Sequence, residues 1–417
     1  MTSPEPAVTT PSTRAAAESP RGEAAQGLAP EHPLVAGRTS RSRLITAYSG
    51  RRPDVLPVWF MRQAGRSLPE YRELRVGTNM LDACLDPALA SEITLQPVRR
   101  HHVDAAIFFS DIVVPLKLAG VDIDIVPGKG PVLGTPVRTA ADVAALPTLD
   151  MDALAPVSEG VRQTIAGLAE LEPQAAALVE SASADSAVGD VPLIGFAGAP
   201  FTLAAYLVEG GPSKDHIRAR TLMHADPDVW HALMTWAADI TGSFLRSQVL
   251  AGASAAQLFD SWAGALSLDD YTRHVAPASA RALSHVRDLT YPDPERAADP
   301  VSATPVQRNV PIVHFGVGTG ELLRAMHDIG TDVIGVDYRV PLDEASRRLG
   351  NIVPLQGNID PAFLGAPWPI VEAHVREVVE RGRNAPSHVV NLGHGVPPET
   401  DPSVLTRIVE LVHGLGS

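Results

Sequence analysis

Short runs of apolar residues recur along the chain with room for a helix between one run and the next, and this alternation limits the folds available to it. The runs are almost wholly apolar, which is typical of parallel strands covered on both faces. We expect strands at Leu56–Phe60, Asp104–Ser110, Pro192–Gly198, Ala255–Ser261, Val310–Val317, Asp332–Tyr338, Val353–Ile359 and His388–His394. We expect helices in the amphipathic segments Ala88–His101, Pro227–Ala251, Leu268–Leu289, Glu321–Ile329 and Pro369–Arg383.

Strands that are each followed by a helix predict an α/β fold, a single (β/α)8 TIM barrel. A doubly wound open sheet would give the same pattern and is the alternative. The barrel predicts one domain over residues 41–417. Residues 1–40 are rich in Pro, Ala, Ser, Thr and Glu, which indicates a disordered N-terminal tail. Two further segments have the composition of surface insertions, at Ser181–Asp190 and Tyr291–Asn309.

The composition excludes several classes of function. A formal net charge of −14 argues against nucleic-acid binding, which requires a basic surface. No stretch approaches the roughly 18 consecutive apolar residues of a transmembrane helix, so we expect no membrane span. The single cysteine, Cys84, excludes an internal disulfide and a zinc site built on several cysteines. Cysteine usage of this kind fits the reducing environment of the cytoplasm.

Two arginines stand where the first expected strand ends. Arg62 and Gln63 follow the apolar run directly, and Arg66 comes after a small Ala-Gly step. Each guanidinium can bind a carboxylate or a phosphate in bidentate fashion. For arginine pairs in general, two solvated surface side chains are about as common as an anion-binding site. The reactive groups of barrel enzymes lie at the carboxyl ends of strands, so we regard this pair as an anion-binding candidate.

A carboxylate and a glycine turn follow two other runs. Asp111 comes directly after Ile107–Ser110, where an ionised carboxylate needs a partner or a ligand. An N-cap of the next helix would explain it equally well. The turn Gly198–Pro200 leads from a strand into a helix, but it matches neither a phosphate-binding loop nor a dinucleotide-binding fingerprint. We therefore expect no nucleotide site.

Longer strings carry a family resemblance. The segment Met61–Arg72 reads Met-Arg-Gln-Ala-Gly-Arg-Ser-Leu-Pro-Glu-Tyr-Arg and closely resembles the N-terminal signature of the uroporphyrinogen decarboxylase family. The segment Leu193–Leu203 resembles the second signature of that family, and Gln257–Gly264 and Asn391–Gly395 also resemble it, in the right order. The resemblance extends from about Arg41 to Leu415.

The resemblance implies roles for individual residues. Asp111 would be catalytic and would face the pyrrole N–H groups of a cyclic tetrapyrrole, and Arg62 is the second catalytic candidate, as proton donor. The implied substrate-binding residues are Arg62, Gln63, Arg66, Asp111, Tyr206, Phe259, Ser261 and His394. The alternative for Tyr206 is a packed helix aromatic, which a lone tyrosine usually is. The chain departs from the pattern at Trp262, where many relatives carry histidine.

The implied activity is that of a carboxy-lyase. It would convert the four acetate side chains of uroporphyrinogen III to methyl groups, giving coproporphyrinogen III in haem and porphyrin biosynthesis, with no cofactor and no metal. The family typically forms homodimers. Two other interpretations are a zinc-dependent corrinoid or thiol methyltransferase on the same barrel, and a tetrapyrrole-binding protein without activity. The first is disfavoured because Cys84 has no His-x-Cys spacing.

Overall fold

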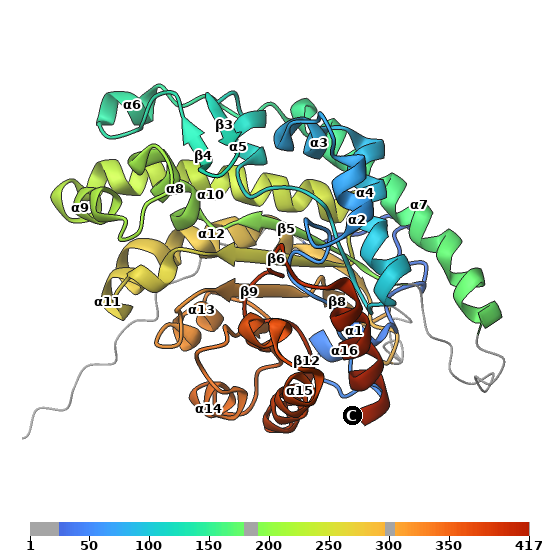
Figure 1. The fold of residues 1–417 in the computed structure, drawn as a ribbon. Helices are drawn as coiled ribbons and strands as arrows, with labels where there is room; N and C mark the ends of the chain where they lie inside the picture. Colours follow the sequence, from blue (N-terminus) through green and yellow to red (C-terminus); the bar gives the residue numbers. More distant parts are fainter. Residues whose placement is uncertain (1–24, 179–190, 297–304, 417) are drawn as a thin grey trace, which may run out of the picture.

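A curled sheet of seven parallel strands forms the centre of the protein (Figure 1). The structure is a computed structural model that describes residues 25–178, 191–296 and 305–416. In spatial order the strands are β12 (His388–Val389), β11 (Leu355–Gln356), β10 (Val333–Gly335), β9 (Ile312–Gly316), β6 (Ala255–Asp260), β5 (Leu193–Gly198) and β2 (Ala106–Ile107). This order is the chain order reversed. Because the strands are parallel, all their carboxyl ends lie on the same side of the sheet. We call the residues that follow these ends the rim.

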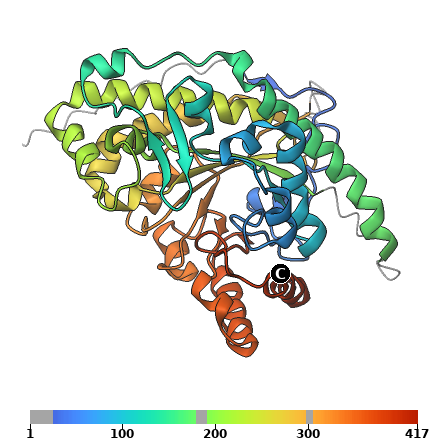
Figure 2. The same cartoon turned by 45° about the horizontal axis from the view of Figure 1, so that its top comes forward.

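Helices surround the strands, as apolar parallel strands require (Figure 2). They are α1 (Arg43–Tyr48), α2 (Pro69–Leu74), α3 (Met80–Leu85), α4 (Pro87–His101), α5 (Val114–Leu118), α6 (Ala140–Ala144), α7 (Ala155–Leu178), α8 (Pro200–Glu209), α9 (Ile217–Ala225), α10 (Pro227–Leu250), α11 (Leu268–Asp270), α12 (Ala276–Arg287), α13 (Leu323–Asp328), α14 (Leu342–Arg348), α15 (Trp368–Gly382) and α16 (Pro402–Leu415). No helix of the described residues is long and apolar enough to cross a membrane. An antiparallel hairpin of β3 (Ile123–Val126) and β4 (Gly130–Leu133) lies outside the central sheet.

Seven of the eight expected strands are confirmed as members of this sheet. The remaining one, Leu56–Phe60, forms an isolated parallel bridge between Val58 and Val390. The Pro57 carbonyl accepts a hydrogen bond from the Val390 N–H at 2.9 Å. Proline has no N–H to donate, which limits the length of a regular ladder at this position.

Residues 25–40 of the expected tail pack against the body. β1 (Gln26–Gly27) pairs in parallel with β7 (Leu289–Pro292), and Leu34 is fully buried. A His32 ring nitrogen lies 2.9 Å from the Val249 carbonyl oxygen. The boundary at residue 40 is therefore wrong, since scattered apolar residues in this polar stretch find partners far along the chain. Residues 1–24 lie outside the described residues.

The two expected insertions differ in how much of them is described. Ser181–Asp190 lies outside the described residues. The second insertion begins in β7 and ends in β8 (Gln307–Asn309), which pairs with β7 in antiparallel fashion, while residues 297–304 between them are not described. The long polar insertion thus starts and ends in regular structure at the edge of the body.

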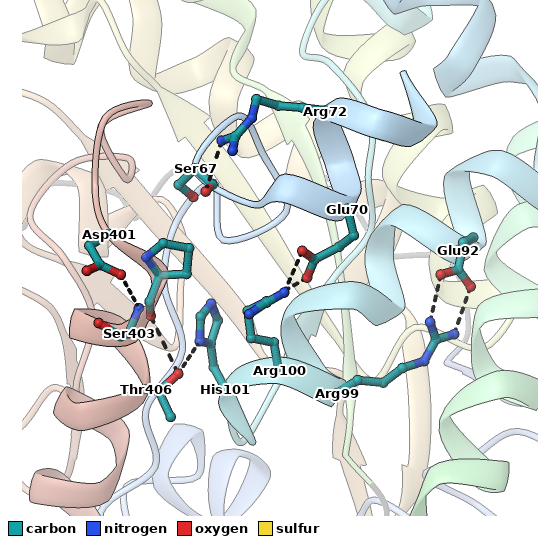
Figure 3. A network of polar contacts seen from close by, with 11 residues as sticks. Ser67, Glu70, Arg72, Glu92, Arg99, Arg100, His101, Asp401, Ser403 and Thr406 are labelled. Atoms are coloured by element: carbon teal, nitrogen blue, oxygen red, sulfur yellow. Dashed lines mark hydrogen bonds and ion pairs between the residues drawn. The ribbon is translucent and has the colours of Figure 1, made fainter. Parts of the chain in front are cut away.

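The last turn of α4 fastens two neighbouring helices (Figure 3). Arg100 donates two hydrogen bonds to Glu70 on α2, at 2.6 and 2.7 Å. The next residue, His101, is buried and places its Nδ1 2.8 Å from the Thr406 hydroxyl on α16. The ion pair is partly exposed and contributes about 0–1 kcal/mol. It joins α4 to α2, the helix that directly follows the arginine pair.

Buried histidines make the stability of this fold sensitive to acid. His388 begins β12, and its Nε2 donates to the Gly357 carbonyl at 2.6 Å. Burial lowers the pKa of His388 to about 4. Burial also lowers the pKa values of His32 and His101 to about 4. The native state therefore binds fewer protons than the unfolded chain between pH 4 and about 6.5, and stability rises with pH across that interval.

We predict that His388→Gln reduces the loss of stability between pH 7 and pH 5. Glutamine keeps an N–H donor for Gly357 but does not titrate. Urea unfolding at both pH values should show wild type losing about 1–2 kcal/mol more than the variant. A loss common to both pH values does not affect this comparison. Equal pH dependence in the two proteins would contradict a neutral buried His388.

Candidate active site

Arg62 lies in a turn that several hydrogen bonds hold in place. Its backbone φ is 61°, a left-handed conformation that costs free energy in an arginine. The Gln63 N–H donates to the Phe60 carbonyl at 3.0 Å, and the Phe60 N–H donates to the Gln63 Oε1 at 3.0 Å. Beyond β12, the Asn391 Oδ1 accepts from the Met61 N–H at 2.9 Å. The first expected strand and the last one thus fix the turn together.

Gln63 is completely buried and its side chain serves the backbone. Besides the bond to Phe60, its Nε2 donates to the Ala105 carbonyl at 3.0 Å, immediately before β2. Both polar ends of the carboxamide are therefore occupied within the protein. This geometry favours a role in holding the Arg62 turn against β2, and substrate binding by Gln63 stays a prediction.

Gly395 leaves space for the Arg62 side chain. A Cβ at residue 395 would lie 2.4 Å from the Cδ of Arg62 and 2.9 Å from its Cγ, closer than carbon atoms approach without bonding. The next residue, Val396, donates its N–H to the Met61 carbonyl at 2.9 Å. The glycine of the last motif therefore allows the arginine of the first motif to lie where it does.

Asp111 lies at the rim just beyond β2 and closes a turn. Its Oδ1 accepts from the Val113 N–H at 3.0 Å, ahead of α5. Asp111 is therefore not the N-cap of α5, which is Val113. It accepts a hydrogen bond from that N-cap residue instead. Burial raises the pKa of Asp111, while the bond to Val113 and the positive charge of Arg62 act in the opposite direction. The ionised carboxylate is incompletely compensated and would be stabilised by N–H donors from a ligand.

Tyr206 on α8 lies within the electrostatic reach of both groups. Burial, followed by the charge of Asp111, raises its pKa to about 12, and Arg62 lowers it slightly. At neutral pH the phenol therefore keeps its proton and can donate a hydrogen bond. Its ring meets the Trp262 ring edge to face at 5.9 Å between centroids, and Trp262 in turn lies 4.8 Å from the His216 ring. Trp262 thus makes aromatic contacts with both Tyr206 and His216.

Aromatic rings line three adjacent strands near the rim. Phe259 on β6 meets Phe196 on β5 at 5.4 Å and Phe315 on β9 at 5.9 Å, both edge to face. Two residues on, Ser261 is half-buried, and the described residues offer its hydroxyl no hydrogen bond. The Thr202 hydroxyl fixes the strand end by donating to the Asp260 carboxylate at 3.0 Å.

His394 and Arg339 lie together at the ends of β12 and β10. A Cβ at Gly393 would lie 2.2 Å from the Tyr338 nitrogen, so the two strand ends are in close contact. Partial burial lowers the pKa of His394, and the charges of Arg62 and Arg339 lower it further. His394 is therefore a neutral imidazole at neutral pH, beside two cations.

Sequence reasoning missed Arg339. One guanidinium nitrogen donates to the buried Asp337 carboxylate at 2.5 Å, and the guanidinium lies 4.6 Å from the centre of the Tyr338 ring. The remaining N–H groups have no acceptor among the described residues, and the side chain is 48% exposed. The available signal was its position directly after the expected strand Asp332–Tyr338, where it stands close to a strand end as Arg62 does.

The charge of Arg62 lowers the pKa values of Asp111, Tyr206 and His394, which indicates that these four side chains lie near one another. Arg66 is exposed, and its charge contributes to none of these shifts. Among the described residues, one group of three could hold a metal ion, and it contains none of these rim residues. The arrangement can bind carboxylates at Arg62 and receive N–H donors at Asp111.

Comparison with known proteins gives this arrangement a family. The model of the family described as "Uroporphyrinogen decarboxylase (URO-D)" matches residues 39–415. The chain belongs to the uroporphyrinogen decarboxylase family. It is 68% identical to the uroporphyrinogen decarboxylase of Leifsonia xyli subsp. xyli, over 93% of this chain and 98% of the relative. It is 64% identical to that of an Arthrobacter strain, over 91% and 99% of the two chains.

A solved structure of a protein with a different name shares the fold of this chain. A methyltransferase from Methanosarcina mazei superposes with a TM-score of 0.68 and 19% identity, covering 89% of this chain and 98% of its own. At this identity the likeness concerns the fold. The family match, by contrast, covers the site motifs.

We predict that Gly395→Ala displaces the Arg62 side chain and lowers kcat/KM at least about tenfold. The reason is the forced contact with Cδ, which moves the guanidinium away from Asp111 and His394. Steady-state kinetics with urea unfolding would separate this from a general loss of stability. Gly365→Ala is the matched control, because a Cβ there meets nothing within 4 Å. Wild-type kinetics in Gly395→Ala would contradict the assigned path.

Proposed function

We propose that this chain decarboxylates uroporphyrinogen in porphyrin biosynthesis, converting its four acetate side chains to methyl groups without a bound cofactor. The observation that carries the proposal is the family match over residues 39–415. The product would be coproporphyrinogen, with the III isomer as the proposed substrate. The grouping of Arg62, Asp111, Tyr206 and His394 supports it, since these side chains suit a ring of N–H donors bearing carboxylates.

The reaction needs an electron sink, and a pyrrole can supply its own. A proton adds to a ring carbon and makes the ring cationic. The bond to the carboxylate then breaks, its electrons move into the ring and CO2 leaves. The exocyclic methylene carbon takes a proton and becomes the methyl group, while the ring carbon loses the first proton. The net change at each acetate is replacement of CO2 by a proton.

Asp111 suits the stabilisation of that cationic ring. Its charge is costly in the free protein, because burial opposes it and Val113 supplies only one donor to Oδ1. Several pyrrole N–H groups around the carboxylate would replace the lost hydration. The attraction strengthens as the ring becomes cationic, so Asp111 would stabilise the transition state more than the ground state.

The carboxylates of the substrate require local positive charge, since the chain as a whole carries −14. Arg62 would bind the reacting acetate and is also our candidate for the proton donor. Arg66 and the neutral imidazole of His394 would bind further carboxylates. Tyr206, Ser261 and the ring of Phe259 would complete the contacts to the substrate, and Gln63 would hold the Arg62 turn.

We also propose that residues 56–60 close the sheet as the eighth strand of a (β/α)8 barrel. Val58 bridges to Val390 beyond β12, and its carbonyl accepts from the Asp104 N–H at 2.9 Å, just before β2. The segment thus contacts both edges of the seven-stranded sheet. From the family resemblance we further propose one catalytic domain extending to residue 417, a homodimer and a cytoplasmic location.

The function is tested by incubating the purified chain with uroporphyrinogen under reducing conditions and separating the oxidised products by chromatography. We expect successive loss of carboxylates down to coproporphyrin, without added cofactor. Tight binding with no CO2 release would instead identify a tetrapyrrole-binding protein. Methyl transfer to a thiol or a corrinoid, with uroporphyrinogen untouched, would identify the methyltransferase alternative.

We predict that Asp111→Asn lowers kcat about 100-fold or more while the protein stays folded. Asparagine keeps an oxygen for the Val113 N–H, but it removes the charge that stabilises the ring. Asp150→Asn is the matched control, because Asp150 also accepts at 3.0 Å from the backbone N–H two residues ahead, Asp152. Turnover near that of wild type in Asp111→Asn would rule out charge stabilisation.

We predict that Arg339→Gln raises KM for uroporphyrinogen about three- to tenfold with little change in kcat. The free N–H groups of Arg339 lie beside His394, where they would bind a substrate carboxylate away from the reacting bond. Arg324→Gln is the control, since Arg324 is an exposed arginine of α13 paired with Asp328 at 2.8 Å. An unchanged KM would remove Arg339 from the binding set without affecting the proposed activity.

A further inference from the structure

Two histidines and an aspartate converge outside the active site. His224 lies in the last turn of α9, Asp270 ends α11, and His274 lies in the π-helix η3 (Tyr271–Val275) that follows. One ligand atom from each residue lies within 4.8 Å of the other two. The segments come from different parts of the rim, since α9 lies in the chain beyond β5 and η3 beyond β6.

The one ligand-to-ligand distance that is known fits a shared metal ion better than it fits a hydrogen bond. The Nε2 of His224 is 3.5 Å from the Oδ1 of Asp270, which is long for a hydrogen bond. Two ligands of a tetrahedral zinc ion, with bonds of about 2.1 Å, are about 3.4 Å apart. The two imidazole rings meet at 82° with 5.7 Å between centroids. The rings are therefore not stacked on each other.

Within the described part of the chain, no partner outside the group of three occupies the ligand groups. Among the described residues, the Asp270 carboxylate is paired only with His224, and no hydrogen bond is made by either imidazole. Two imidazoles and one carboxylate form a donor set that zinc accepts, with a fourth position left for water.

The backbone around two of the ligands is held independently of any ion. The Trp230 Nε1 donates to the His274 carbonyl at 3.0 Å, and the Asp270 N–H donates to the Ser267 hydroxyl at 3.1 Å. Tyr271, the first residue of η3, is fully buried. π-helical turns are rare and occur frequently at functional sites. An ion would therefore meet two ligands on a fixed frame, with His224 as the third.

We propose that His224, Asp270 and His274 bind one divalent ion of the zinc type. The ion would join α9 to η3 and so link the segments that follow β5 and β6. At its other end α9 begins beside His216, whose ring packs on Trp262, the neighbour of Tyr206. The ion is a structural link between two rim segments. It takes no part in the decarboxylation.

The test is metal binding to the full chain after removal of bound metal with a chelator. Equilibrium dialysis against zinc should give one ion per chain. Cobalt bound in place of zinc should give the visible absorption of a four-coordinate ion. His274→Ala and Asp270→Asn should each weaken zinc binding at least about tenfold. Removing only a group that hydrogen-bonds to a metal ligand already weakens metal binding about tenfold or more. Zinc should also raise the Tm of wild type but not of these variants.

The control is His231→Ala, which removes an exposed histidine of α10 outside the group and should leave binding unchanged. The proposal is overturned if wild type binds no zinc, or if His274→Ala and Asp270→Asn bind it as tightly as wild type does. Circular dichroism of each variant excludes loss of fold as the cause of weaker binding.

Discussion

The position of Arg62 is the constraint on which the rest of the site depends. Its backbone is left-handed, and the cost is offset by hydrogen bonds that the side-chain oxygens of Gln63 and Asn391 accept from the Phe60 and Met61 N–H groups. Because Gly395 has no Cβ, it leaves room for the Arg62 side chain to pass beside it. Three segments far apart in the chain therefore cooperate to hold one guanidinium near Asp111. This requirement explains why a glycine follows the histidine of the last motif and why a fully buried glutamine follows the arginine of the first.

The charges at the rim are arranged by sign. The cations Arg62 and Arg339 lie beside the neutral His394, whereas Asp111 is a half-buried carboxylate with few donors. A ligand with carboxylates at its edge and N–H groups at its centre matches this pattern. A chain with a net charge of −14 can therefore bind a polyanion, since the relevant field is local and falls off within about 10 Å at ordinary ionic strength.

Much of the fold could be predicted from the sequence, because parallel strands covered by helices are apolar throughout. Seven strands and the motif residues at their ends followed from that pattern and from the family strings. Residues 25–40 did not, because their few apolar side chains pack against distant segments such as β7. Arg339 was missed since its meaning depends on β10 lying near β12. The backbone role of Gln63 depends likewise on Ala105, 42 residues away, which no local pattern reveals.

The central claim is that Asp111 receives the ring N–H groups while Arg62 holds a carboxylate at the periphery. The most direct measurement is a crystal structure of the chain with coproporphyrinogen bound. The account predicts pyrrole nitrogens at about 2.7–3.2 Å from the Asp111 carboxylate and a peripheral carboxylate on the Arg62 guanidinium. A ring bound elsewhere on the rim, or one with Asp111 facing water and Arg62 unliganded, would contradict it.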